Sequence, residues 1–154
     1  MNHLLYRKED RQMKEQKSNG IFILIELTDN IIHPVGLELI GKGKELADQI
    51  ITIDDPALET YMTEPYAHAL TEVVMAYNPE IVLIGATAIG RDVAPRLSAR
   101  LHTGLTADCT TLEIQEESNY LMMTRPAFGG NIMATILCPD HRPQMIWLEW
   151  KILT

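Results

Sequence analysis

Arg125 is the first residue whose surroundings suggest chemistry. Pro126 and then Ala-Phe-Gly-Gly-Asn follow it, and His141 and Arg142 lie beyond the next apolar run. Proline fixes the backbone, and a glycine pair permits angles that other residues avoid, so we expect a shaped loop. A guanidinium held by such a loop can donate paired hydrogen bonds to a phosphate or to the carbonyl oxygen and ring nitrogen of a flavin. An ion pair or a loop-anchoring hydrogen bond is the structural alternative.

A second candidate loop, residues 85–92, reads Gly-Ala-Thr-Ala-Ile-Gly-Arg-Asp and follows an apolar run. Backbone N–H groups at the start of a helix favour anions, which makes Gly85, Gly90 and Arg91 candidate contacts for an anion or a partner. A purely structural turn is the alternative. The spacing resembles a phosphate-binding P-loop, but Arg91 and Asp92 stand where that motif has Lys and Ser or Thr. The phosphate lysine and the magnesium hydroxyl are both absent, which argues against ATP hydrolysis.

Other reactive side chains form no recognisable set. The histidines are scattered, the paired carboxylates at 54–55 and 116–117 fall in predicted turns, and no Ser or Cys sits on a tight strand–helix elbow. Cys109 and Cys138 have neither ligand spacing nor a disulfide framework around them. We expect both to be buried free thiols.

Composition limits the class of protein. The 154 residues are 46% hydrophobic and 22% charged, enough for one domain with a real core. A net charge of −8 argues against a nonspecific nucleic-acid binder, which would carry a basic face. We find no secretion signal and no apolar stretch long enough to cross a membrane, and therefore expect a cytoplasmic protein without membrane insertion.

The elements that must position these loops alternate between strand and helix over the first two thirds of the chain. Apolar runs predict buried strands at 21–27, 50–53 and 81–84. Helical spacing predicts helices from Pro34, at 64–77 and at 93–101, the last with Gly104 as C-cap. Strands at 110–114, 120–124 and 132–137 follow. The pattern predicts an α/β fold, with a parallel sheet and a C-terminal β extension.

One connection in this pattern is too short. Only Ala47, Asp48 and Gln49 separate the predicted helix from the strand at 50–53, and no glycine is among them. A helix normally turns through a loop of two or more residues before a strand. Either the last helical turn unwinds, or this chain lacks a segment that related chains have.

Four runs together resemble the N-terminal domain of the electron-transfer flavoprotein alpha subunit, from about residue 19 to residue 145. They are PVGLELIGKGKELAD (34–48), IDDPALETY (53–61), PEIVLIGATAIGRDVAPRLSARLHTGLTADCT (79–110) and TRPAFGGNIMATILCPDHRPQM (124–145). The resemblance implies a flavodoxin-like or adenine-nucleotide-hydrolase-like, Rossmann-like sheet with helices on both faces. It also implies a heterodimer with a beta subunit. The heterodimer would carry electrons from acyl-CoA or other flavin dehydrogenases, as in fatty acid β-oxidation. The opening NGIFILIELTDN is more similar to the members that perform electron bifurcation.

Two departures from the family change what we expect of the cofactors. The family has another strand and helix where Ala47 and Asp48 join here, and residues 146–154 do not match the linker and FAD domain that follow in the family. We therefore divide the chain into a polar arm (1–19), the family-like domain (20–145) and a non-matching tail (146–154). We expect FAD in the complete heterodimer, a second FAD or AMP on the beta subunit, and no flavin on this chain alone.

The resemblance implies that Arg125 faces the beta-subunit cofactor, with Thr124, Phe128 and Asn131 shaping the loop around it. Two other readings remain open at this point. The chain could be a stand-alone adenine-nucleotide-binding module that uses residues 85–91. It could also be a nonfunctional remnant whose sheet is damaged by the lost strand.

Overall fold

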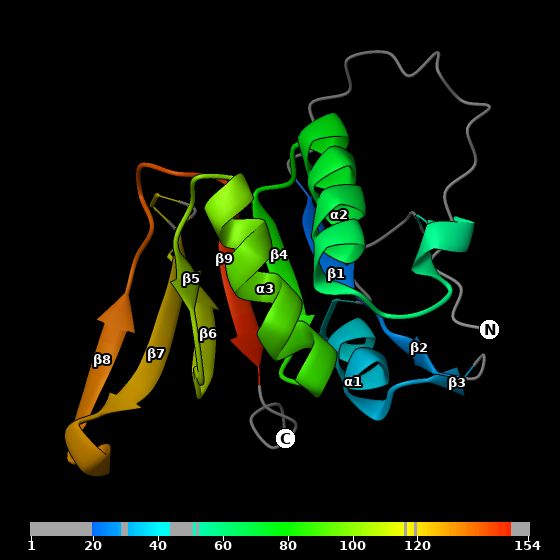
Figure 1. Ribbon diagram of the computed structural model, residues 1–154. Helices are drawn as coiled ribbons and strands as arrows, with labels where there is room; N and C mark the ends of the chain where they lie inside the picture. The colour runs from blue at the N-terminus through cyan, green and yellow to red at the C-terminus, as the bar shows by residue number, and fades with distance from the viewer. Residues whose placement is uncertain are drawn as a thin grey trace.

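A computed structural model describes residues 20–28, 31–43, 51, 53–115, 117–118 and 120–148 (Figure 1). Its centre is a four-stranded sheet in the order β1-β4-β9-β5, in which all pairs are parallel. The register aligns Ile21 with Ile81, and Ile81 with Gln144. The predicted α/β class is confirmed. The bounds are β1 Ile21–Leu24, β4 Ile81–Gly85, β5 Leu105–Thr106 and β9 Gln144–Leu148.

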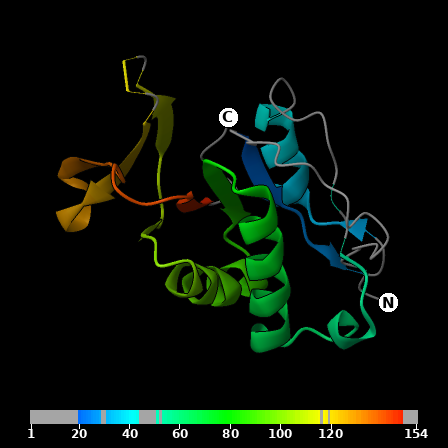
Figure 2. The same ribbon diagram turned by 90° about the horizontal axis from the view of Figure 1, so that it is seen from above.

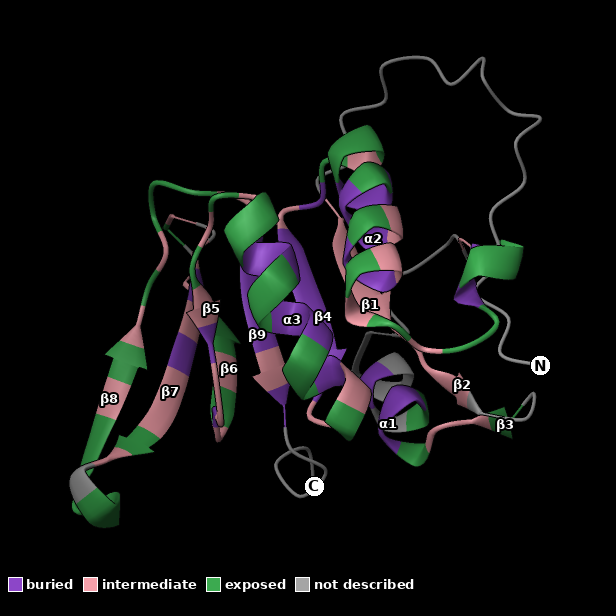
Figure 3. Cartoon of the chain, in the orientation of Figure 1, coloured by how far each residue is buried: buried purple, intermediate pink, exposed green. Residues whose placement is uncertain are grey.

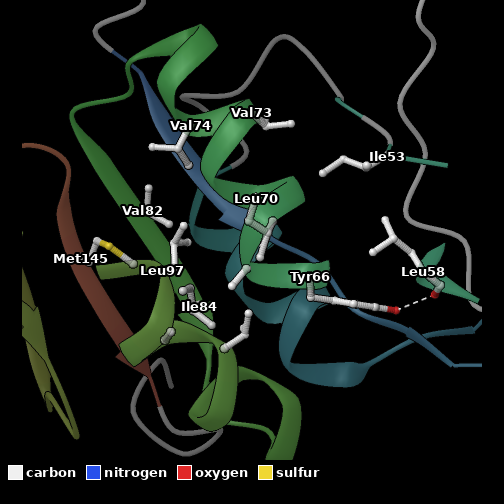
Figure 4. Close-up of a cluster of buried hydrophobic side chains, with 13 residues drawn as sticks. Ile53, Leu58, Tyr66, Leu70, Val73, Val74, Val82, Ile84, Leu97 and Met145 are labelled. Carbon is white, nitrogen blue, oxygen red and sulfur yellow. Dashed lines mark hydrogen bonds between the residues drawn. The ribbon is translucent and has the colours of Figure 1, made fainter. Parts of the chain in front are cut away.

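Two helices, α2 (Thr63–Tyr77) and α3 (Ala88–Arg100), cover one face of this sheet. Side chains at helical spacing on α2, among them Tyr66 and Leu70, meet Val82 and Ile84 of β4 in the first hydrophobic core (Figure 4). The predicted helix at 64–77 is confirmed. It ends at Asn78, which takes the left-handed conformation at φ 49°.

The other face of the parallel sheet carries α1 (Pro34–Gly43) and an antiparallel sheet in the order β6-β7-β8. Because side chains alternate along a strand, Ile81 and Leu83 point to this face, where they meet Leu39 of α1 and Met123 of β7. Helices therefore lie on both faces, as Figure 2 shows for α1 and α2 on either side of β1. The antiparallel strands are β6 Thr111–Ile114, β7 Leu121–Ala127 and β8 Ile132–Ile136.

The N-terminal half departs from the sequence prediction in two places. The strand expected at 21–27 breaks after Leu24, and a short hairpin follows, made of β2 (Leu27–Thr28) and β3 (Ile31–Ile32). The strand expected at 50–53 is wrong for Ile51 and Ile53, which lie in no strand. Ile53 is buried in the first core, close to the short helix η1 (Pro56–Leu58). Residues 44–50, including the short connection at Ala47, and the predicted arm 1–19 lie outside the described residues.

The C-terminal half departs from the prediction at β9. Ile146, Trp147 and Leu148, expected in a non-matching tail, belong to β9, which lies between β4 and β5. The domain boundary predicted after Met145 therefore falls within a strand. Ile146 and Leu148 are fully buried. Figure 3 colours the chain by burial and shows buried residues in β9. Within the described residues, no helix is both long and apolar enough to cross a membrane.

Candidate functional site

Arg125 lies in a strand, and the prediction of a loop at this position is wrong. β7 continues through Arg125 and Pro126, which pair with Ala134 and Met133 of β8. Thr124 O accepts from Thr110 N at 2.7 Å, so its polar groups face β6, and Pro126, two residues on, faces the same side. β6 pairs with β7 only as far as Thr124. The missing N–H of Pro126 thus faces a position beyond the end of β6, where no ladder bond needs it.

Strand alternation places Thr124 and Arg125 on opposite faces of the β6–β8 sheet. We call the face with Leu121, Met123 and Arg125 the inner face, because the first two side chains are buried against the parallel sheet. Thr124 is on the outer face, where its hydroxyl lies 3.0 Å from that of Thr135. Thr124 and Arg125 therefore cannot contact one ligand through their side chains from the same face.

The Arg125 side chain is half-buried, and within the described residues it makes no hydrogen bond or ion pair. Its positive charge nevertheless affects the pKa of the nearby Cys109 thiol. Burial raises the pKa of the Cys109 thiol to about 11, and the positive charge of Arg125 opposes this rise. Arg125 thus approaches the segment that leads into β6, with its donors unused by the described part of the chain.

The remaining residues predicted around Arg125 lie in the turn between β7 and β8. Phe128 opens the short helix η2 (Phe128–Gly130), and Asn131 follows it and is exposed. Gly129 and Gly130 take φ values of 72° and 89°, in the left-handed region that favours glycine. The glycine pair is therefore explained by the turn itself.

Gly85 and Gly90 are explained by close packing. Gly90 lies in the first turn of α3, which begins at Ala88, earlier than the predicted start at Val93. A Cβ on Gly90 would come within 1.9 Å of Gly85 O, and a Cβ on Gly85 within 2.4 Å of Val35 Cγ1. Both positions exclude a side chain because strand β4, helix α1 and helix α3 meet there.

A carboxylate already occupies the start of α3. Thr87 caps the helix: its Oγ1 accepts from Gly90 N at 2.9 Å and donates to Glu26 Oε1 at 2.5 Å. Burial raises the pKa of Glu26, against the lowering effects of the Thr87 hydrogen bond, the His33 charge and the Gly90 N–H. An anion at this helix start would meet Glu26, which weakens the case for a phosphate site here. The sequence signal for Glu26 was its position as the one charge in the run 21–27.

We expect Glu26→Gln to stabilise the fold increasingly as the pH rises. A carboxyl whose pKa is raised on folding contributes stability that is complete below its unfolded pKa and is lost as the pH rises through the folded pKa. Glutamine can still accept from Thr87 but has no charge to desolvate. Urea unfolding between pH 4 and pH 8 should show a gap between variant and wild type that widens and then levels off. Glu59→Gln, at an exposed position, serves as the control. A gap independent of pH would contradict this.

Arg91 connects the residue before the α3 N-cap to the carboxyl end of β9. Its Nε donates to Ala86 O at 3.2 Å, and its guanidinium carbon lies 5.7 Å from the centre of the Trp147 ring. Asp108 accepts from Trp147 Nε1 at 3.3 Å and lies 3.9 Å from Arg91 NH1. Asp108 thus contacts Arg91, and the next residue, Cys109, is influenced by Arg125. The structure brings these two predicted cations to the same short segment, which Thr124 contacts only through its backbone O.

Comparison with known proteins gives the family. Residues 44–149 match the family model described as electron transfer flavoprotein domain, a range that includes all of β9. The chain is 42% identical to the electron transfer flavoprotein subunit alpha of Clostridium acetobutylicum (86% of this chain, 48% of the relative). It is 49% identical to the subunit of the same name from Thermoanaerobacterium thermosaccharolyticum (89% and 40%). It is 38% identical to lactate dehydrogenase (NAD(+),ferredoxin) subunit LctC of Acetobacterium woodii (98% and 43%).

The chain spans less than half the length of each of these three relatives. The match nevertheless covers the described elements from η1 to β9, which include both helices α2 and α3. The resemblance drawn from the four sequence runs is confirmed. The chain belongs to the electron transfer flavoprotein family.

Proposed function

We propose that this chain is the N-terminal region of an electron transfer flavoprotein alpha subunit and pairs with a beta subunit. In the complete complex, electrons pass from flavin dehydrogenases, with acyl-CoA dehydrogenases among the candidates, to a further acceptor. The family match and the names of the relatives support the electron-transfer role. As a finer proposal, we infer a bifurcating type of complex from the opening NGIFILIELTDN, and the printed name of the Acetobacterium woodii relative, which includes both NAD(+) and ferredoxin, is consistent with it. The function as a stand-alone nucleotide module is not favoured, since Glu26 occupies the start of α3.

The observation that supports pairing most directly is the apolar surface of the β6–β8 sheet. Large apolar side chains are normally exposed singly, but here two consecutive ones are exposed at one end of a small sheet. Ile132 and Met133 are 55% and 54% exposed at the start of β8, and strand alternation places them on opposite faces. Both faces of this end of the sheet are therefore apolar. The exposed set on and beside the sheet is Ile114, Ile132, Met133 and Leu137.

Met133 offers a direct test of the pairing surface. We expect Met133→Gln to weaken binding to an electron transfer flavoprotein beta subunit by about tenfold, because about 1–2 kcal/mol of apolar burial is lost at a central contact. The measurement is a calorimetric titration of the chain with the beta subunit. Met75→Gln is the matched control, since Met75 is 68% exposed on α2, away from this sheet. Equal affinities for the two variants would show that the partner binds elsewhere.

We further propose that the inner face of the β6–β8 sheet approaches a flavin or AMP held by the beta subunit, with Arg125 as the contact. Support comes from the position of Arg125 on that face and from its lack of a partner among the described residues. FAD is the cofactor that we propose for the complete complex. Thr124, on the outer face, is then a structural residue, and Gly85, Gly90 and Arg91 support the fold near this site.

Replacing Arg125 tests this contact separately from pairing. We expect Arg125→Ala to leave the complex intact but to shift the visible absorption or circular dichroism of its flavin, because a cation beside the ring is removed. Arg125→Lys keeps the charge and loses the planar fork, so a smaller shift is expected. A flavin spectrum unchanged in Arg125→Ala would place Arg125 away from the cofactor.

A further inference from the structure

Two linkers join the β6–β8 sheet to the parallel sheet. The first covers residues 107–110, between β5 and β6, and the second covers residues 137–143, between β8 and β9. The second linker is largely exposed, including Pro139, Asp140 and His141, so burial does little to order it. Fixing an exposed segment costs conformational entropy, about 1–2 kcal/mol per residue, unless specific contacts compensate. Arg142 makes those contacts.

The Arg142 side chain connects the linker to both sheets. Its Nε donates to Glu80 Oε2 at 2.6 Å, and Glu80 directly precedes β4 of the parallel sheet. Its NH1 donates to Cys138 O and His141 O, each at 2.9 Å, so the linker is closed on itself. Its guanidinium carbon lies 5.5 Å from the centre of the Tyr120 ring, which directly precedes β7. One side chain therefore contacts the base of both sheets and the chain between them.

Hydrogen bonds around Arg142 also connect the two sheets. We call Arg142 and these hydrogen bonds the Arg142 joint. Gln144, the first residue of β9, is fully buried, and its Oε1 accepts from Leu121 N, the first residue of β7, at 3.0 Å. The Gln144 N–H donates to Glu80 O at 2.8 Å, so the acceptor of Arg142 is itself held in place. Thr103 lies in the loop between α3 and β5, and its Oγ1 donates to Pro143 O at a distance of 2.8 Å.

We propose that Arg142 is a positioning residue: it sets the angle of the β6–β8 sheet against the parallel sheet. With that angle it sets the placement, relative to the partner, of Arg125 on the inner face and of Met133 on the outer face. This inference rests on the proposed function. The buried contacts of Leu121 and Met123 also attach the sheet, but apolar contacts are non-directional. The guanidinium fork is directional, and a lysine cannot reproduce it.

The length of β7 makes the angle matter. The strand has seven residues, which at about 3.4 Å per residue gives ~24 Å. The first residue of β7, Leu121, is fixed beside Arg142 by its hydrogen bond to Gln144. The strand is held a second time at Thr124, whose O accepts from Thr110 N. A small rotation at the joint therefore moves the far end, at Ala127 and the turn beyond, by several times the displacement at the base. The residues proposed to meet the partner lie toward that end.

The test uses the chain reconstituted with an electron transfer flavoprotein beta subunit, and compares Arg142→Lys with wild type. We expect about a tenfold loss of affinity. At saturating beta subunit, we also expect the visible circular dichroism of the flavin to shift in the direction seen with Arg125→Ala. The matched control is Arg100→Lys, which alters an exposed arginine paired with Glu64 on the other face of the parallel sheet. Glu80→Gln, which removes only the charged acceptor, should give a smaller change of the same kind.

Each outcome separates the possibilities. Affinity equal to that of wild type in Arg142→Lys would overturn the inference. A weaker affinity with a wild-type flavin spectrum at saturation would also overturn it, because a merely stabilising residue lowers the amount of folded chain without moving Arg125. If Arg142→Lys does not fold, the same two readouts on Glu80→Gln decide. If the wild-type chain does not bind the beta subunit, the proposed function is wrong, a result distinct from a failure of the variants alone.

Discussion

Replacing Gly90 with alanine is expected to destabilise the chain by about 3 kcal/mol, the upper end of the range for overpacking a closed site. The added Cβ would lie 1.9 Å from Gly85 O and 3.1 Å from Ile84 Cγ2. The nearest atom belongs to the backbone of β4 and cannot rotate away. Relief requires α3 to move from the sheet, which also disturbs the hydrogen bond from Gly90 N to Thr87 Oγ1. The loss would be measured by urea unfolding followed by far-ultraviolet circular dichroism.

Gly104→Ala is the matched control for this experiment. Gly104 is exposed, its φ is not positive, and a Cβ there meets no atom within 4 Å. Alanine at such a position leaves stability unchanged or raises it by about 0.4–1 kcal/mol, because it restricts the unfolded chain. If Gly90→Ala were as stable as Gly104→Ala, the close approach of α3 to β4 would be wrong.

Ile146→Ala is expected to destabilise the chain by about 2–5 kcal/mol, because it opens a cavity in the second core. Ile146 is fully buried in β9, and it packs in the cluster that contains Leu83 of β4 and Met123 of β7. The strand pairs with both neighbours, aligning Ile146 with Leu83 and Thr106. Thermal and urea unfolding of the chain alone would measure the loss.

The same change at an exposed isoleucine provides the comparison. Ile132 is 55% exposed at the start of β8, and surface substitutions of this kind usually stay within about 0.5 kcal/mol. A cost for Ile146→Ala no larger than that for Ile132→Ala would mean that residues 146–148 do not form the inner strand described above.

The elements predicted well from sequence are those whose pattern is local and long. Tyr66, Leu70 and Val74 recur at helical spacing and lie in α2, and the run from Ile81 lies in β4, buried on both faces. In these segments a single periodicity matches the burial, so no distant contact is needed to identify them. The family was identified for the same reason, from runs that contain these elements.

The elements that were missed depend on contacts far along the chain. Pro143 precedes β9 and the polar Gln144 opens it, so its pattern is weak, and its place in the sheet is set by β4 and β5. Arg125 was assigned to a loop because Pro126 suggests a break, whereas the proline is tolerated where β6 has ended. Glu26 lies in an apolar run, and its partner Thr87 is 61 residues away. Sequence reasoning had no local signal for any of these pairings.

The position of β9 has a consequence for how the chain folds while it is being synthesised. β9 is the last strand described, yet it lies between β4 and β5, which cannot be joined until it is present. At about 5–20 residues per second, translation of residues 86–143 takes about 3–12 s after β4 is complete. During that interval β4, whose residues are all buried in the finished fold, has one edge unpaired. The nascent chain is therefore more exposed to edge-to-edge aggregation than the finished domain, in which β4 is paired on both sides.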